Sequence, residues 1–364
     1  MLSVKKTFWP IFVLAAVLVA VQLLACASGR EYYLTQLIMA AYYAIVVMGL
    51  CLVMGYAGQV SLGHGAFFAI GGYISAALTT TNFAAARAAV WGRLLERAGV
   101  LAARPGLYGG EEIVAVTPWA AFLAAMAAAF VVALVIGYPA LRLKGHYLAM
   151  ATLGFGLIVY RLLLGTQALG AADGITGVPP WHLAPGITVS GQKALRVENY
   201  YVAWTLALAT LLVLHNLVNS RVGRALRSIH DGEFAANAMG IDTAAYKLRA
   251  FVLSALLAAA AGSFLTHYSG GIGPSEAGAM KSVRYVALVA AGGMANVWGG
   301  LVVSSILNFL SLRGCFGTLD QAVFGVLLVV IVSLAPEGPL QPLGAWLRRL
   351  GGARGAGRSA HGPA

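Results

Sequence analysis

The stretch GYAGQVSLGHGAFFAIGGYISA, residues 55–76, decides the fold because it is apolar enough for a membrane yet contains six glycines and one histidine. Small residues recur in it at steps of three and four, which places them on one face of a helix. Such faces let helices approach closely in lipid, where van der Waals contact drives association. The spacing predicts a helix-packing seam made of Gly65, Ala69, Gly72 and Ala76.

Three polar residues stand near the start of the same stretch, namely Gln59, Ser61 and His64. We expect them in the first turn or two of the helix. A histidine inside a membrane span is costly unless it faces a cavity or a polar partner. Two interpretations therefore stay open: these side chains line a solute pathway, or they form hydrogen bonds to a neighbouring helix.

The composition of the whole chain places this stretch in a membrane protein. The 364 residues are 60% hydrophobic and 10% charged, whereas soluble domains carry about 25% charged residues. We predict an all-α polytopic membrane protein, because about 20 apolar residues form each spanning helix. About ten apolar segments are recognisable, at residues 8–27, 33–54, 60–80, 117–137, 146–165, 199–219, 250–268, 282–293, 297–311 and 318–335.

Two of these segments need separate interpretation. The first could be a signal peptide, but its length favours a transmembrane span. The eighth, 282–293, is too short to cross alone and ends in Gly292-Gly293, so we expect a broken span. Residues 1–345 are predicted to form the membrane domain, and 346–364 a basic, disordered tail near lipid.

The net charge of +12 could suit nucleic acid, but basic residues beside apolar spans indicate contact with anionic lipid instead. Lysine and arginine are more numerous on one side, which predicts cytoplasmic N- and C-termini. That orientation places Lys281 and Arg284 outside. No acidic residue falls within the middle of a predicted span, which argues against a proton- or sodium-coupled carrier.

Catalytic motifs are absent from the sequence. It contains no HExxH motif and no phosphate-binding loop, and its three cysteines lack metal-site spacing. We expect no catalytic residue, no metal and no bound cofactor. Any energy from ATP must therefore come from another chain.

Two loops on the predicted outer side are distinctive. The loop at 81–116 contains a helically spaced core, AAARAAVWGRLLERAGVLAARP, which suggests a helix on the membrane surface; a weakly ordered insertion is the favoured alternative. The loop LGAADGITGVPP, residues 169–180, is rich in turn formers. Its Asp173, Gly174 and Thr176 either receive the amino group of an amphoteric substrate or form a plain turn.

A polar interval, 220–249, separates two predicted spans on the inner side. It reads SRVGRALRSIHDGEFAANAMGIDTAAYKLR and predicts a hydrophilic helix–turn–helix. Its centre, AANAMG, is small and ends in Gly240. Such an element either docks into another protein or forms an ordinary cytoplasmic loop.

With these segments the chain resembles the LivH/LivM-type permeases of bacterial ABC importers for branched-chain amino acids, and looks most like the LivM branch. The resemblance rests on segments that follow the family's order: GYAGQVSLGHGAFFAIGGY at 55–73, LRLKGHYLAMATLGFG at 141–156, DGITGVP at 173–179, RALRSIHDGEFAANAMGIDTAAYKLRAFVLSALLAAAAG at 224–262, VAAGGMANVWGG at 289–300 and PEGPL at 336–340.

The resemblance implies a type II importer fold in the bacterial cytoplasmic membrane. It implies a heterodimer with a second permease, two ATPase subunits that use ATP and Mg, and an extracytoplasmic binding protein. The inner loop would be the coupling helix, with Glu233, Ala235, Ala236 and Gly240 in its motif. Phe234 stands where the motif's glutamate would align, which weakens any specific role for Glu233. The insert at 83–112 also departs from the family's pattern.

The resemblance implies import by alternating access, in which the coupling loop carries the motion of the ATPases to the spans. A urea or short-chain amide importer shares this architecture and is the nearest alternative. A stand-alone small-solute channel would need no coupling loop, so the 220–249 interval argues against it.

Overall fold

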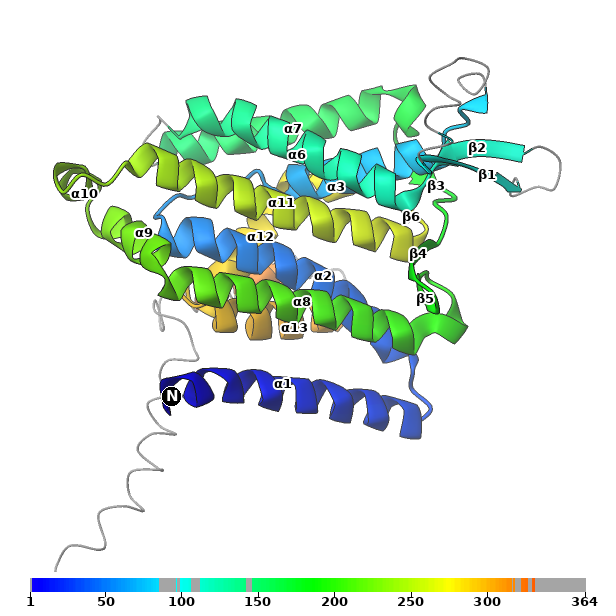
Figure 1. Cartoon of the computed structure of the whole chain (residues 1–364), viewed down its shortest axis with the longest axis horizontal. Helices are drawn as coiled ribbons and strands as arrows, with labels where there is room; N and C mark the ends of the chain where they lie inside the picture. Colours follow the sequence, from blue (N-terminus) through cyan, green and yellow to red (C-terminus); the bar gives the residue numbers. More distant parts are fainter. Residues whose placement is uncertain are drawn as a thin grey trace, which may run out of the picture.

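The computed structural model describes residues 2–84, 96, 99–105, 112–141, 146–315, 317, 322–326 and 329–330. Within these ranges the protein is a bundle of long apolar helices that lie side by side (Figure 1). The α-helices in chain order are α1 (Leu2–Ala27), α2 (Tyr32–Cys51), α3 (His64–Thr80), α6 (Pro118–Ala140), α7 (His146–Gly165), α8 (Arg196–Asn219), α9 (Arg221–Asp231), α10 (Glu233–Ala238), α11 (Thr243–Ser269), α12 (Ala279–Gly292) and α13 (Val297–Leu312).

Six of the described helices are long and apolar enough to cross a membrane: α1, α2 with the π-helical turn η1 (Leu52–Tyr56), α6, α7, α8 and α11. Helix α2 lies in the centre of the bundle, and 89% of its most apolar 18-residue stretch is buried. Helix α1 packs along the outside of the bundle, where the Tyr200 hydroxyl donates to the Leu18 carbonyl over 3.1 Å. The membrane bundle is thus confirmed, whereas the count of ten spans stays a prediction.

The remaining predicted segments differ in length from the expectation. Helix α3 begins at His64, four residues later than predicted, because Gly58 takes a left-handed φ of 67° and the chain stays irregular up to Gly63. Helices α12 and α13 have 14 and 16 residues. The segment at 318–335 and the tail at 346–364 lie largely or wholly outside the described residues.

The turn between α12 and α13 explains why the eighth segment is interrupted. Helix α12 ends where Gly293 adopts a φ of 87°, and Asn296 caps α13 by accepting a hydrogen bond from the Gly299 amide over 3.1 Å. The Cys51 thiol donates to the Met294 carbonyl over 2.8 Å, which holds this turn against the end of α2. The predicted short helix that ends at Gly292-Gly293 is confirmed.

The described part of the fold is mostly helical, as predicted, and it also contains short strands. In the described residues, three two-stranded antiparallel sheets lie at one end of the bundle (Figure 1). Their strands are β1 (Leu101–Pro105) with β2 (Glu112–Val116), β3 (Ile175–Thr176) with β6 (Gly271–Ile272), and β4 (Trp181–Ala184) with β5 (Ile187–Val189). Trp181 anchors the third sheet, because its buried ring packs 4.6 Å from that of Phe264.

The insert at 81–116 therefore contains a β-hairpin at its C-terminal end. Leu101 pairs with Val116, and the Phe83 amide donates to the Val114 carbonyl over 2.7 Å. The β-branched run Ile113-Val114 favours an extended strand, and Ala102 and Ala103, at the end of the helically spaced core, lie in the strand paired with it. The residues expected to form a surface helix lie mostly outside the described ranges.

Helices α9 and α10 project from the opposite end of the bundle, where the N-terminus of α1 also lies (Figure 1). The predicted helical interval 220–249 is confirmed, although Gly232 divides it and α10 has only 6 residues. The two ends of the bundle therefore differ: short sheets at one, a polar helical projection at the other.

Candidate functional site

His64 occupies the first position of α3 and is enclosed by the bundle. Its Nδ1 lies 3.2 Å from the Ser61 hydroxyl, and its Nε2 lies 2.7 Å from the Ser254 hydroxyl on α11. The structure thus contains the hydrogen bond to a neighbouring helix that the sequence left open. A pathway role for His64 and Ser61 stays a prediction.

Gln59 and Ser61 lie before α3 rather than in its first turn, which corrects the expected placement. Both side chains are buried. In the described part of the chain, the Gln59 Oε1 atom has no hydrogen-bond partner. The Gln59 amide oxygen is therefore free to accept a hydrogen bond from a water or a solute.

The glycine-rich face of α3 lies against neighbouring backbone. A Cβ atom on Gly72 would collide with the side chains of Thr266 and Ile272, and the Gly65 amide donates to the Ser282 hydroxyl over 3.3 Å. Ala69 and Ala76 are fully buried. The tightest approach of this helix is at Gly71, because a Cβ atom there would overlap the Ala259 backbone of α11. The steps of three and four residues in the sequence did not include Gly71.

The loop at 169–180 lies among the sheets at the end of the bundle that carries β3 and β6 (Figure 1). Thr176 pairs with Gly271. Gly174 takes a left-handed φ of 73°, and a Cβ atom at this position would also overlap the Ile272 carbonyl. Asp173 and Thr176 are exposed. The structure does not bring these three residues together with Gln59 and Ser61, which precede α3, or with His64, which begins it.

A charged cluster that the sequence analysis missed lies inside the bundle. The Lys281 ammonium is 2.8 Å and 3.0 Å from the two carboxylate oxygens of Glu276, and it donates to the Tyr43 hydroxyl over 3.0 Å. The Tyr43 hydroxyl in turn donates to Glu276 Oε1 over 3.3 Å. Three elements contribute to the cluster: α2, the 3₁₀ turn η4 (Pro274–Ala277) and α12.

The depth of this cluster corrects two predictions. Tyr43 stands about halfway along the 25-residue span Tyr32–Tyr56, or about 17 Å from its start at 1.5 Å per residue. Glu276 and Lys281 therefore lie near the middle of the bundle, not on its outer side. The argument against a carrier from missing carboxylates fails, because η4 and the start of α12 return into the bundle after α11.

One signal in the sequence could have revealed this cluster. The segment GPSEAGAMKSVRY at 273–285 places a glutamate and a lysine directly before a span that is too short. Interrupted helices place their ends inside a membrane protein, where a charged pair marks a functional site.

The projecting helix α10 ends in a Schellman motif. The Ile241 amide donates to the Ala236 carbonyl over 3.1 Å, the Gly240 amide donates to the Asn237 carbonyl over 2.9 Å, and Gly240 takes a φ of 81°. Ala236 faces inward, whereas Ala235 and Gly240 are exposed. Glu233 forms an ion pair with Lys247 of α11 at 2.7 Å, so it attaches the projection to the bundle.

Two large apolar side chains on this projection face outward. Phe234 is 79% exposed and Met239 is 83% exposed. Beside them, a cavity of about 550 Å³ opens between the end of α6 and the start of α11. An apolar surface beside a cavity at a polar end of the bundle is suited to contact with another protein.

A bundle of spanning helices, an interrupted span with a partly buried charged pair, and a projecting helical loop are together typical of a polytopic membrane permease. The sequence profile described as "Branched-chain amino acid transport system / permease component" matches residues 32–332. The chain belongs to this family, and the resemblance seen in the sequence is confirmed.

Curated relatives carry the same description. The chain is 30% identical over 320 residues to the high-affinity branched-chain amino acid transport system permease protein LivM of Escherichia coli K12, covering 82% of this chain and 67% of the relative. It is 23% identical over 326 residues to the LivH permease protein of the same organism, covering 85% of this chain and 96% of the relative. No solved structure matches the chain significantly.

Proposed function

We propose that this chain is one of two permease subunits of an ATP-driven importer of branched-chain and other hydrophobic amino acids in the bacterial cytoplasmic membrane. Its partners are a second permease, two ATPase subunits that bind ATP and Mg, and an extracytoplasmic binding protein. The fold is of the type II importer kind with about ten spans, and both termini are cytoplasmic. Family membership and the LivM and LivH relatives support this proposal.

The observation that carries the proposal is the exposed apolar face of α10. Exposed large apolar side chains on a short polar projection are typical of a docking element. Phe234 and Met239 flank the small residues of the coupling motif, so they are placed to enter a groove of an ATPase subunit. The residues of the coupling motif then set the shape of α10 and attach it to the bundle, and they perform no chemistry. These residues are Glu233, Ala235, Ala236 and Gly240.

The attachment of α10 offers a mechanical route into the bundle. The Glu233–Lys247 ion pair and the hydrogen bond from the Thr243 hydroxyl to Asn237, at 3.2 Å, connect α10 to the start of α11. Helix α11 packs directly against α3 through Gly71 and Gly262. A displacement of α10 by the ATPases would therefore reach the α3 segment, and alternating access follows if substrate and ATP favour different states.

Replacement of Phe234 by Asp tests this proposal. The Phe234 side chain is 79% exposed, and a charge at its position opposes apolar docking. In vesicles that contain the complete importer, we expect Phe234→Asp to lower ATP-dependent uptake of labelled leucine on the order of tenfold, with membrane levels unchanged.

Ile187→Asp is the matched control, because Ile187 is an exposed apolar residue at the opposite end of the bundle. The importer that carries Ile187→Asp should take up leucine and hydrolyse ATP at the rates of the wild type. Leucine uptake that persists without the ATPases would refute the proposal. Uptake of labelled urea in place of leucine would retain the mechanism and change the substrate.

A further inference from the structure

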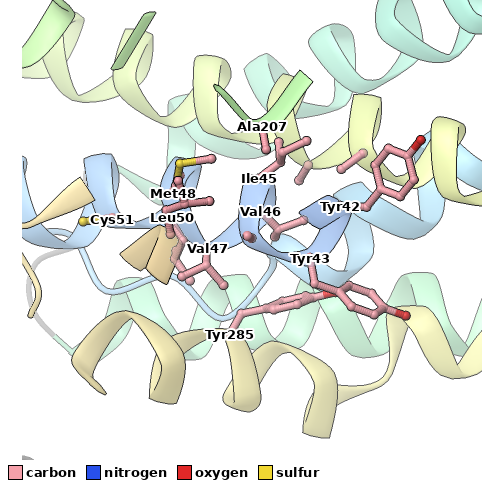
Figure 2. Close-up of a cluster of buried hydrophobic side chains, with 14 of the residues drawn as sticks. Tyr42, Tyr43, Ile45, Val46, Val47, Met48, Leu50, Cys51, Ala207 and Tyr285 are labelled. Atoms are coloured by element: carbon pink, nitrogen blue, oxygen red, sulfur yellow. The ribbon is translucent and has the colours of Figure 1, made fainter. Parts of the chain in front are cut away.

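A small cavity lies between α2, α12 and α13, beside the charged cluster. Its volume is about 30 Å³, and the described residues that line it are Tyr43, Lys281, Arg284, Tyr285, Asn308 and Leu312. Tyr43 stands halfway along α2 and Leu312 ends α13, so the cavity extends from the middle of the bundle toward the end of α13. Figure 2 shows Tyr285 beside Tyr43, with ring centroids 6.2 Å apart.

Two polar groups in this wall are buried without a partner. Tyr285 is 1% exposed and Asn308 is 2% exposed. Within the described residues, neither the Tyr285 hydroxyl nor the Asn308 Nδ2 atom has a hydrogen-bond partner. Such groups are costly in an apolar surrounding, so a cavity that contains both calls for a ligand with acceptor atoms.

The lysine beside the cavity indicates where the cavity opens. The Lys281 side chain remains 28% exposed although it lies at mid-depth in the bundle. A charged side chain at this depth is very costly against hydrocarbon, so this wall borders a polar path or another protein. Helix α12 also begins here, and the N-terminal end of an interrupted helix favours an anionic group.

We infer that this cavity binds the carboxylate of the transported amino acid. The inference rests on the proposed function and assigns one site to it. A water needs about 10–15 Å³, so the cavity accommodates two water-sized oxygen atoms but no amino-acid side chain. The Tyr285 hydroxyl and the Asn308 amide donate to the carboxylate, and the Lys281 ammonium, which is paired with Glu276, lies beside it. The substrate side chain extends out of the cavity, so this chain recognises the group that all its substrates share.

The variants Tyr285→Phe and Asn308→Leu test this assignment. Each removes an unpaired polar group from a buried position, so neither should destabilise the protein. In vesicles with the complete importer and saturating binding protein, two quantities are measured: leucine imported and ATP hydrolysed. We expect the leucine imported per ATP to fall on the order of tenfold in each variant, with ATP hydrolysis still stimulated by loaded binding protein.

Tyr42→Phe is the matched control, because the Tyr42 hydroxyl is also buried without a partner in the described chain but does not line the cavity. Its ratio of leucine to ATP should equal that of the wild type. Wild-type ratios in both cavity variants would overturn the assignment and leave the proposed function intact. A wild-type complex that imports no leucine would overturn both.

Discussion

At the scale of single residues, two polar side chains of this bundle each have one partner close in the sequence and one distant in it. His64 bridges Ser61 and Ser254, and Lys281 is held between Glu276 and Tyr43. Inside a membrane such partners stabilise the groups that would otherwise face hydrocarbon. The distant partners are brought close by the tertiary structure, and no local secondary-structure preference accounts for them.

The His64–Ser254 hydrogen bond should contribute measurably to stability. Replacement of Ser254 by Ala leaves the His64 Nε2 atom buried without its partner, so we expect a loss of about 1–2 kcal/mol. The change is measured as a lower unfolding midpoint of the purified protein in detergent micelles. Ser263→Ala is the control on the same helix, because the Ser263 hydroxyl is buried without a partner. Equal midpoints for the two variants would contradict this account.

At the scale of elements, the contact between α3 and α11 depends on glycine. Gly71 and Gly72 of α3 face Ala259 and Gly262 of α11, and a Cβ atom at Gly262 would in turn overlap the Phe68 backbone. The two backbones therefore approach more closely than side chains allow. The Gly-Gly pair fits the packing interpretation of the 55–76 stretch.

Gly71→Ala should separate these two helices. The added methyl group cannot fit against the Ala259 backbone, so we expect a loss of about 1–3 kcal/mol from overpacking. The readout is the fraction of membrane-extracted protein that remains monodisperse after heating. Gly154→Ala provides the comparison, since Gly154 of α7 has no atom near its Cβ position, and it should be neutral or slightly stabilising. A Gly71 variant as heat-resistant as the Gly154 variant would refute the close approach.

At the scale of the whole molecule, the bundle is polar at both ends but in different ways. The three small sheets lie at one end, and α9 and α10 project from the other (Figure 1). Coupling to ATPases requires that the projection face the cytoplasm, which agrees with the excess of lysine and arginine on that side.

Cysteine labelling in intact cells tests this orientation. After replacement of Cys26, Cys51 and Cys315, a single cysteine is introduced at exposed Ala184 of β4 or at exposed Ala238 of α10. A membrane-impermeant maleimide should label the Ala184→Cys protein in intact cells, and the Ala238→Cys protein only after the cells are opened. The reverse pattern would invert the proposed topology and exclude ATPase docking at α10.

The sequence alone determined the membrane bundle, the family, the interrupted span before Gly293 and the helical interval at 220–249, because apolar run length, glycine placement and motif order are local properties of a chain. Only the tertiary structure decided where Glu276 and Lys281 lie. The sequence placed them beside a span, yet η4 and α12 return to the level of Tyr43. That depth depends on a contact between Tyr43 and Lys281, which are more than 230 positions apart in the sequence. The segment 273–285 signals a charged pair before a short span, but no local pattern encodes the contact of that pair with Tyr43.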